Sequence, residues 1–157
     1  MQDAQDVSAQ SSQADLIQAR IKAENQLKSG TNWFWWIAGL SVVNSLILLS
    51  GSDWNFVVGL GATQVVDGVA QALASELPDV GTIVKVGGLL IDVAIAGLFA
   101  LLGFLARKRF AWAFIIGIIL YSLDGLIFLL LQSWLNVGFH AFALFGIYSG
   151  LKALKTL

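Results

Sequence analysis

The sequence contains no cysteine, one proline and one histidine among its 157 residues. The absence of cysteine excludes disulfides, thiolate nucleophiles and sulfur-ligated metals, and one histidine cannot build a histidine-rich metal site. Charged side chains are also scarce, since Asp, Glu, Lys and Arg make up 12% of the chain, about half the share in an ordinary soluble domain. We therefore expect a fold that is not soluble, with no metal and no cofactor.

Positive charge is absent from a long middle part of the chain. No Lys or Arg lies between Lys28 and Lys85, and the segment 51–84 carries four acidic residues. Most other basic residues form clusters beside apolar runs, an arrangement that marks the cytoplasmic side of membrane proteins. The net charge of -1 gives no reason to expect nucleic acid as a partner. The clusters are Arg20, Lys22 and Lys28; Arg107, Lys108 and Arg109; and Lys152 and Lys155.

What the chain has instead is long apolar runs. Hydrophobic residues make up 57% of it, and its runs are long enough, or nearly so, to cross a hydrocarbon core of about 30 Å. We predict an all-α polytopic membrane protein, with a four-helix bundle embedded in the lipid bilayer over residues 32–157. Residues 1–31 are predicted to form a cytoplasmic tail with a short helix, the alternative being a solvated tail. The predicted spans are 33–49, 83–105, 111–131 and 137–154.

The segment 56–74 is apolar but is the least convincing span. Its polar residues recur three and four positions apart and so share one helical face, while its larger apolar residues gather near the other. This pattern predicts an amphipathic helix that is interfacial or re-entrant. If it does not cross, the basic clusters lie on one side, so both termini are expected in the cytoplasm, in a bacterial inner membrane. The two faces are Gln64, Asp67 and Gln71, and Val58, Val65, Val69 and Leu73.

Few polar side chains occur inside the predicted spans, and by the rise of a helix they fall in the outer half of the bilayer. A charged side chain there is costly unless it is paired or faces water, so we treat these residues as a candidate outward-facing polar pocket. The alternative is that Asp92 and Asp124 only bond neighbouring helices, and that His140 is an interfacial residue with one hydrogen bond. The candidate pocket residues are Asn44, Asp67, Lys85, Asp92, Tyr121, Asp124 and His140.

Glycines within the spans predict close helix packing, either inside one subunit or between subunits, because a missing side chain lets two backbones approach. Gly146 and Gly150 form a small-xxx-small pair in the last span. The same reasoning applies to glycines in the second and third spans. The packing candidates are Gly88, Gly117, Gly125, Gly146 and Gly150.

No sequence pattern indicates an enzyme. Two intramembrane aspartates fit the general logic of an aspartyl protease, but the sequences around Asp92 and Asp124 lack its Tyr-Asp and Gly-x-Gly-Asp signatures. No Gly-x-Ser-x-Gly elbow occurs either. The favoured hypothesis is a non-enzymatic scaffold or accessory subunit that forms a homo-oligomer or binds a partner membrane protein. The alternative is a small channel or transporter with Asp92 and Asp124 in its polar pocket, less favoured because the inner half is almost wholly apolar.

Overall fold

The computed structural model describes residues 2–51 and 59–157, which fold into helices and short connections. The predicted all-α class is thereby confirmed. The α-helices are α1 (Gln2–Leu49), α2 (Gly61–Glu76), α3 (Gly81–Arg107), α4 (Ala111–Leu130) and α5 (Trp134–Ala153), and the short 3-10 helices are η1 (Pro78–Val80) and η2 (Leu154–Thr156).

Within the described residues, four helical stretches are long and apolar enough to cross a membrane, and each overlaps one of the four predicted spans. The chain is therefore a multi-pass helical bundle by length and composition. The helix in the predicted segment 56–74 is α2, whose 16 residues begin at Gly61, while residues 56–58 lie outside the described part. At 1.5 Å per residue α2 is about 24 Å long, which is short of a core of about 30 Å. The four stretches are Ser12–Leu49, Pro78–Arg107, Ala111–Leu130 and Trp134–Thr156.

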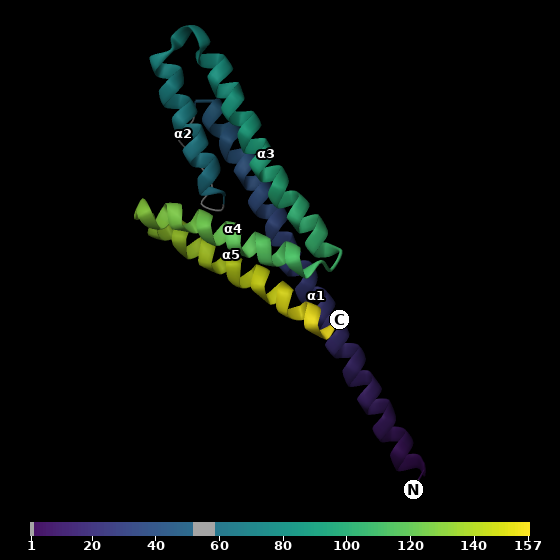
Figure 1. Ribbon diagram of the computed structural model, residues 1–157. Helices are drawn as coiled ribbons and strands as arrows, with labels where there is room; N and C mark the ends of the chain where they lie inside the picture. The colour runs from purple at the N-terminus through teal and green to yellow at the C-terminus, as the bar shows by residue number, and fades with distance from the viewer. Residues whose placement is uncertain (1, 52–58) are drawn as a thin grey trace.

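The first helix is longer than the sequence analysis expected. α1 has 48 residues and continues without a break from the predicted short helix into the first span, so the boundary near residue 31 lies inside one helix. The segment before Gly30 contains no glycine or proline and many strong helix formers, which explains why it stays helical. Its N-terminal part extends beyond the rest of the molecule as a single helix (Figure 1).

α1 and α3 lie side by side and run in opposite directions (Figure 1). α2 packs along α3, and α4 and α5 form a hairpin that lies at an angle to the α1–α3 pair in this view. The core between α1, α3 and α4 holds aromatic rings. The ring of Phe34 lies 6.5 Å from that of Phe99 and 6.0 Å from that of Phe114, centroid to centroid. All three side chains are buried, so this part of the bundle is filled by apolar groups.

Two close helix contacts depend on glycine. A Cβ placed on Gly88 of α3 would lie only 2.9 Å from Ala70 Cβ, so α2 and α3 pack almost backbone to backbone. A Cβ on Gly150 of α5 would lie 2.8 Å from Gly30 Cα in α1. Neither position has room for a larger side chain unless the helices separate.

Three other glycines accept aromatic side chains. The ring of Phe34 covers Gly117, and the indole of Trp33 covers Gly146. The imidazole of His140 lies over Gly125, where an added Cβ would be 3.3 Å from Cδ2 of the ring. The predicted packing glycines therefore all make contacts within this chain.

The basic clusters gather at one end of the bundle, which we call the basic end. Arg109, in the turn after α3, forms an ion pair with Glu24 of α1. Arg107 Nη1 donates a hydrogen bond to Asn32 Oδ1 at 3.4 Å. The end of α5 reaches the same region, because Gly150 packs against α1 there. The three clusters thus share one end of the bundle, as four crossings require.

Candidate functional site

The N-terminus of α2 is capped by a side chain from another helix. Asp124 of α4 accepts a hydrogen bond from the Gly61 amide at Oδ2, 2.7 Å away, and one from the Ala62 amide at Oδ1, 2.8 Å away. The first amides of a helix have no partner within the helix and carry partial positive charge, so a carboxylate is well suited to this position. Leu60, at the N-cap, has no side-chain oxygen to do this itself. Asp124 therefore supplies the cap that the local sequence lacks.

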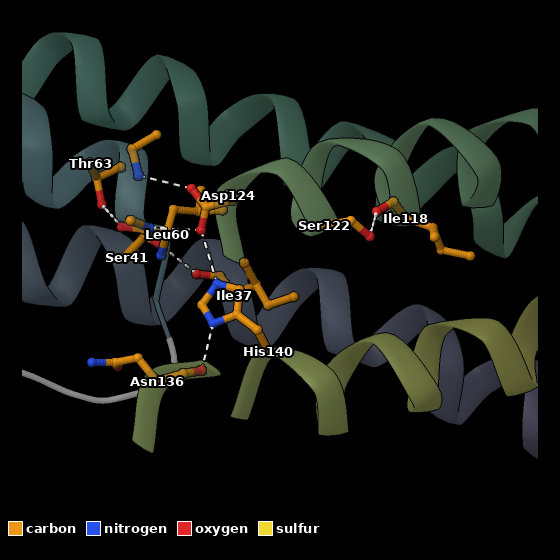
Figure 2. Close-up of polar contacts among 11 residues, drawn as sticks. Ile37, Ser41, Leu60, Thr63, Ile118, Ser122, Asp124, Asn136 and His140 are labelled. Carbon is orange, nitrogen blue, oxygen red and sulfur yellow. Dashed lines mark hydrogen bonds and ion pairs between the residues drawn. The ribbon is translucent and has the colours of Figure 1, made fainter. Parts of the chain in front are cut away.

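α1 holds the same end of α2 from the other side. The Leu60 amide donates a hydrogen bond to Ser41 Oγ at 2.8 Å, and the Ser41 hydroxyl in turn donates to the Ile37 carbonyl at 2.7 Å (Figure 2). Thr63 closes the first turn by donating from its hydroxyl to the Leu60 carbonyl. Ser41 and Leu60 are both buried. The start of α2 is thus fixed inside the bundle by hydrogen bonds to two helices.

His140 of α5 contacts the carboxyl group that caps α2. Its Nε2 lies 3.0 Å from Asp124 Oδ2, and its Nδ1 lies 2.9 Å from the Asn136 carbonyl oxygen (Figure 2). A carbonyl oxygen only accepts, so Nδ1 carries a proton. The hydrogen bond between His140 Nε2 and Asp124 Oδ2 then needs one further proton, which lies either on the nitrogen or on the carboxyl oxygen. In either case the pair has no net charge, which suits two side chains that are 2% and 6% exposed.

Aromatic rings enclose the imidazole. The Tyr121 ring is stacked on His140 with centroids 4.3 Å apart and planes inclined by 15°, and the Phe128 ring lies 5.0 Å away. Tyr121 is fully buried. Its hydroxyl has no hydrogen-bond partner within the described residues. The rings exclude water from the pair formed by His140 and Asp124, which strengthens the electrostatic interaction between them.

A second polar cluster joins α1, α2 and α3. Ser45 Oγ lies 2.8 Å from Asp67 Oδ2 and 3.0 Å from Asp92 Oδ2. One hydroxyl has one hydrogen and can donate fully to only one of these oxygens. The other contact is satisfied only if a carboxyl group carries a proton and donates it to Ser45. Asp92 is completely buried, and its Oδ1 has no partner among the residues that the structure describes.

A small cavity of about 10 Å³ lies beside this cluster. Ser45 and Asp67 line it together with Gln71 and Lys85, so a basic and an acidic residue border the same cavity. A cavity of this size holds about one water molecule. The arrangement can therefore accommodate a water or a proton, but not a larger ligand.

The predicted pocket residues thus fall into two clusters instead of one pocket. Asp67 and Asp92 contact Ser45, and Lys85 lines the adjacent cavity. Asp124 instead caps the start of α2, His140 bonds to Asp124, and Tyr121 stacks on His140. Asn44 is buried on α1, and a Cβ on Gly59 would lie 2.7 Å from its Nδ2.

The sequence analysis missed both serines that organise these clusters. Ser41 and Ser45 are four residues apart and so share a face of α1 with one another, next to Asn44. A run of three small polar residues at this spacing in an apolar span was the available signal. His140 also has a richer environment than the interfacial alternative assumed, since it bonds to both Asp124 and Asn136.

The fold and the two clusters define a class: a helical multi-pass membrane protein in which buried polar side chains fasten a short helix into the bundle. Comparison with protein-family models, with curated proteins and with solved structures finds no match to this chain.

Proposed function

We propose that this protein is a non-enzymatic membrane subunit that assembles with other protein chains. The helical bundle anchors it in the membrane, and the N-terminal part of α1 is the arm through which it binds its partner. The observation that carries this proposal is the exposure of that arm. Residues 12–22 are helical and exposed throughout, and they include Leu16, Ile17 and Ile21, which are 68%, 61% and 55% exposed. We call residues 12–22 the arm.

An exposed arm of this kind gains stability from a partner. An isolated helix of this length is marginal in water, and burying one large aliphatic side chain contributes about 1.5–3 kcal/mol. Ala14, Ile17 and Ile21 recur at helical spacing and form a narrow apolar face, while Leu16 lies on another side of the arm. Asp15 lies on the side of the helix away from Ile17, which we call the polar face. A row of apolar side chains at this spacing is one that a second helix can cover.

The partner we propose is the arm of a second copy, giving a homo-oligomer. The glycines that the sequence analysis considered for oligomer packing are occupied by contacts within the chain, as for Gly146 and Gly150. The arm keeps an apolar face that no part of the described chain covers. Assembly is therefore proposed through the arm, and another membrane protein with a similar helix is the alternative partner.

We further propose that α2 is re-entrant, entering and leaving the membrane at the end opposite to the basic end. Its length, its buried start at Gly61 and its cap by Asp124 support this placement. With the basic end in the cytoplasm, both termini are cytoplasmic. The proposed setting is a bacterial inner membrane.

A channel or transporter is the second candidate. It is favoured by the burial of Asp92 and Asp124 inside the bundle, where acids often mark an ion or proton path. A path would have to continue toward the basic end. That part of the core is filled by Phe34, Phe99 and Phe114, and the cavity beside Ser45 is only about 10 Å³. The interaction subunit is therefore the better supported function.

Disulfide cross-linking tests the proposal, because the natural chain has no cysteine to interfere. Ile17→Cys lies on the apolar face of the arm and Asp15→Cys is its matched control on the polar face. In oxidised membranes we expect a disulfide dimer for Ile17→Cys, several-fold more abundant than for Asp15→Cys. Native mass spectrometry of the wild type from lipid nanodiscs should show a non-covalent dimer. Equal cross-linking of the two variants, or a wild type that is only monomeric, would overturn arm-mediated assembly.

A further inference from the structure

A groove of about 310 Å³ runs along the surface where α1 and α3 meet. Ala38 and Ala96 form its buried base, while Gly39 and Gly97 are exposed and leave the groove open, since a Cβ on either would meet no atom within 4 Å. The groove is lined almost wholly by apolar side chains. It is therefore shaped for a slender apolar group and not for a polar ligand.

The groove has a distinct end toward the basic end of the bundle. Trp35 lines it there and is 46% exposed. A Cβ on Gly103 would lie 3.4 Å from Trp35 Nε1, so the indole sits where α1 and α3 pack together. One turn further along α3, Arg107 reaches across to Asn32 of α1. The groove thus leads from apolar residues, past a tryptophan, to a cation.

Two of the three consecutive basic residues at this end have no acidic partner among the residues that the structure describes. Of the three consecutive basic residues, Arg109 has an acidic partner in Glu24. Arg107 is exposed and donates a hydrogen bond to the neutral Asn32, and Lys108 Nζ lies 4.4 Å from the centre of the Phe104 ring. Neither forms an ion pair within the described residues. Arg107 and Lys108 are therefore two exposed cations near one end of an apolar groove.

We propose that this groove binds an anionic glycerophospholipid. An acyl chain lies in the groove between Gly39 and Gly97, and Arg107 and Lys108 bind the headgroup phosphate. Guanidinium and ammonium groups are good partners for phosphate, and tryptophan favours the depth of the headgroups. Taken alone, the small residues that line the groove would fit the helix of a second copy as well as they fit an acyl chain. The uncompensated charge at the groove's end favours the lipid, because a second apolar helix offers nothing to neutralise it.

Native mass spectrometry of the full chain from nanodiscs of phosphatidylcholine and phosphatidylglycerol tests this site. The wild type should retain phosphatidylglycerol in preference to phosphatidylcholine. Arg107→Gln with Lys108→Gln should reduce that preference about 25-fold, since each of the two basic residues at an anionic surface contributes about fivefold. The control is Lys152→Gln with Lys155→Gln, which removes the same charge from the same end and should leave most of the preference.

A second pair of variants separates the groove from general electrostatics. Gly97→Leu fills the groove without changing charge and should also reduce retention of phosphatidylglycerol. Gly87→Leu is its control on α3, because a Cβ there likewise meets no atom within 4 Å. If Gly97→Leu leaves lipid retention unchanged, or if the Lys152 and Lys155 variant loses as much as the Arg107 and Lys108 variant, the proposal is wrong. Loss of dimers instead of lipid in Gly97→Leu would make the groove an interface between copies.

Discussion

Asp124 Oδ2 and the amide nitrogen of Gly61 lie 2.7 Å apart, so a residue in α4 caps a helix that begins 63 positions earlier in the chain. The same oxygen lies 3.0 Å from His140 Nε2. One carboxyl group therefore fixes the positions of three helices, α2, α4 and α5. This contact holds the start of the short helix α2 in the bundle, together with the hydrogen bond from Leu60 to Ser41 and the packing of α2 on α3.

The first prediction concerns this cap. Asp124→Leu leaves two amides and a buried imidazole without their partner, and breaking such a buried pair costs about 3–5 kcal/mol. Asp124→Asn should cost less, because its amide oxygen still accepts one hydrogen bond. Thermal unfolding in detergent measures both. Ser122→Ala is the control on the same helix, since its exposed hydroxyl bonds only to the Ile118 carbonyl. A Leu variant as stable as that control would show that the cap contributes nothing.

The second prediction concerns the carboxyl groups that meet at Ser45. Asp92→Asn supplies an amide donor for Ser45 or Asp67 in place of the proton that one carboxyl group must otherwise carry, so its melting temperature should equal or exceed that of the wild type. Asp92→Leu removes one of the two carboxyl partners of Ser45 and should lose about 0.5–1.5 kcal/mol. The same melting experiment compares the two. Equal melting temperatures for the Asn and Leu variants would contradict a hydrogen-bonded cluster.

The third prediction compares two glycines of α5. Gly150→Ala places a Cβ 2.8 Å from the Gly30 backbone, and such overpacking should cost about 1–3 kcal/mol. Gly138→Ala meets no atom within 4 Å and should gain up to about 1 kcal/mol, because alanine favours the helix more than glycine. The two variants should therefore change the free energy of unfolding in opposite directions. Stabilisation of both variants would mean that α1 and α5 do not pack closely at Gly150.

The sequence predicted the spans well because each crossing needs a long apolar run, and such runs are visible in composition alone. It also predicted that the segment containing α2 is amphipathic and short of a convincing span. It could not divide the polar residues into two clusters. Helix rise gives the depth of Asp92 and Asp124, but the direction in which each faces depends on how the helices rotate against one another.

The capping of α2 by Asp124 could not be predicted from the sequence for a different reason. Asp124 bonds to backbone amides at Gly61 and Ala62, and a backbone amide has no residue type by which to recognise it. The spacing of Ser41, Asn44 and Ser45 marks a polar face of α1, but it does not identify Asp67 and Asp92 as the residues that Ser45 contacts. Contacts between side chain and backbone, and between three helices at once, appear only in the folded chain.

The proposed topology has four crossings, with α2 entering and leaving the membrane at the same side. Single cysteines at Ser50, Asp79 and Lys108, all exposed positions, test it by labelling intact cells with a membrane-impermeant thiol reagent. Ser50→Cys and Asp79→Cys flank α2 and should both be labelled from outside, whereas Lys108→Cys should be labelled only after the membrane is permeabilised. Labelling of Ser50→Cys and Asp79→Cys from opposite sides would mean that the segment containing α2 crosses the membrane, and would contradict the four-span account.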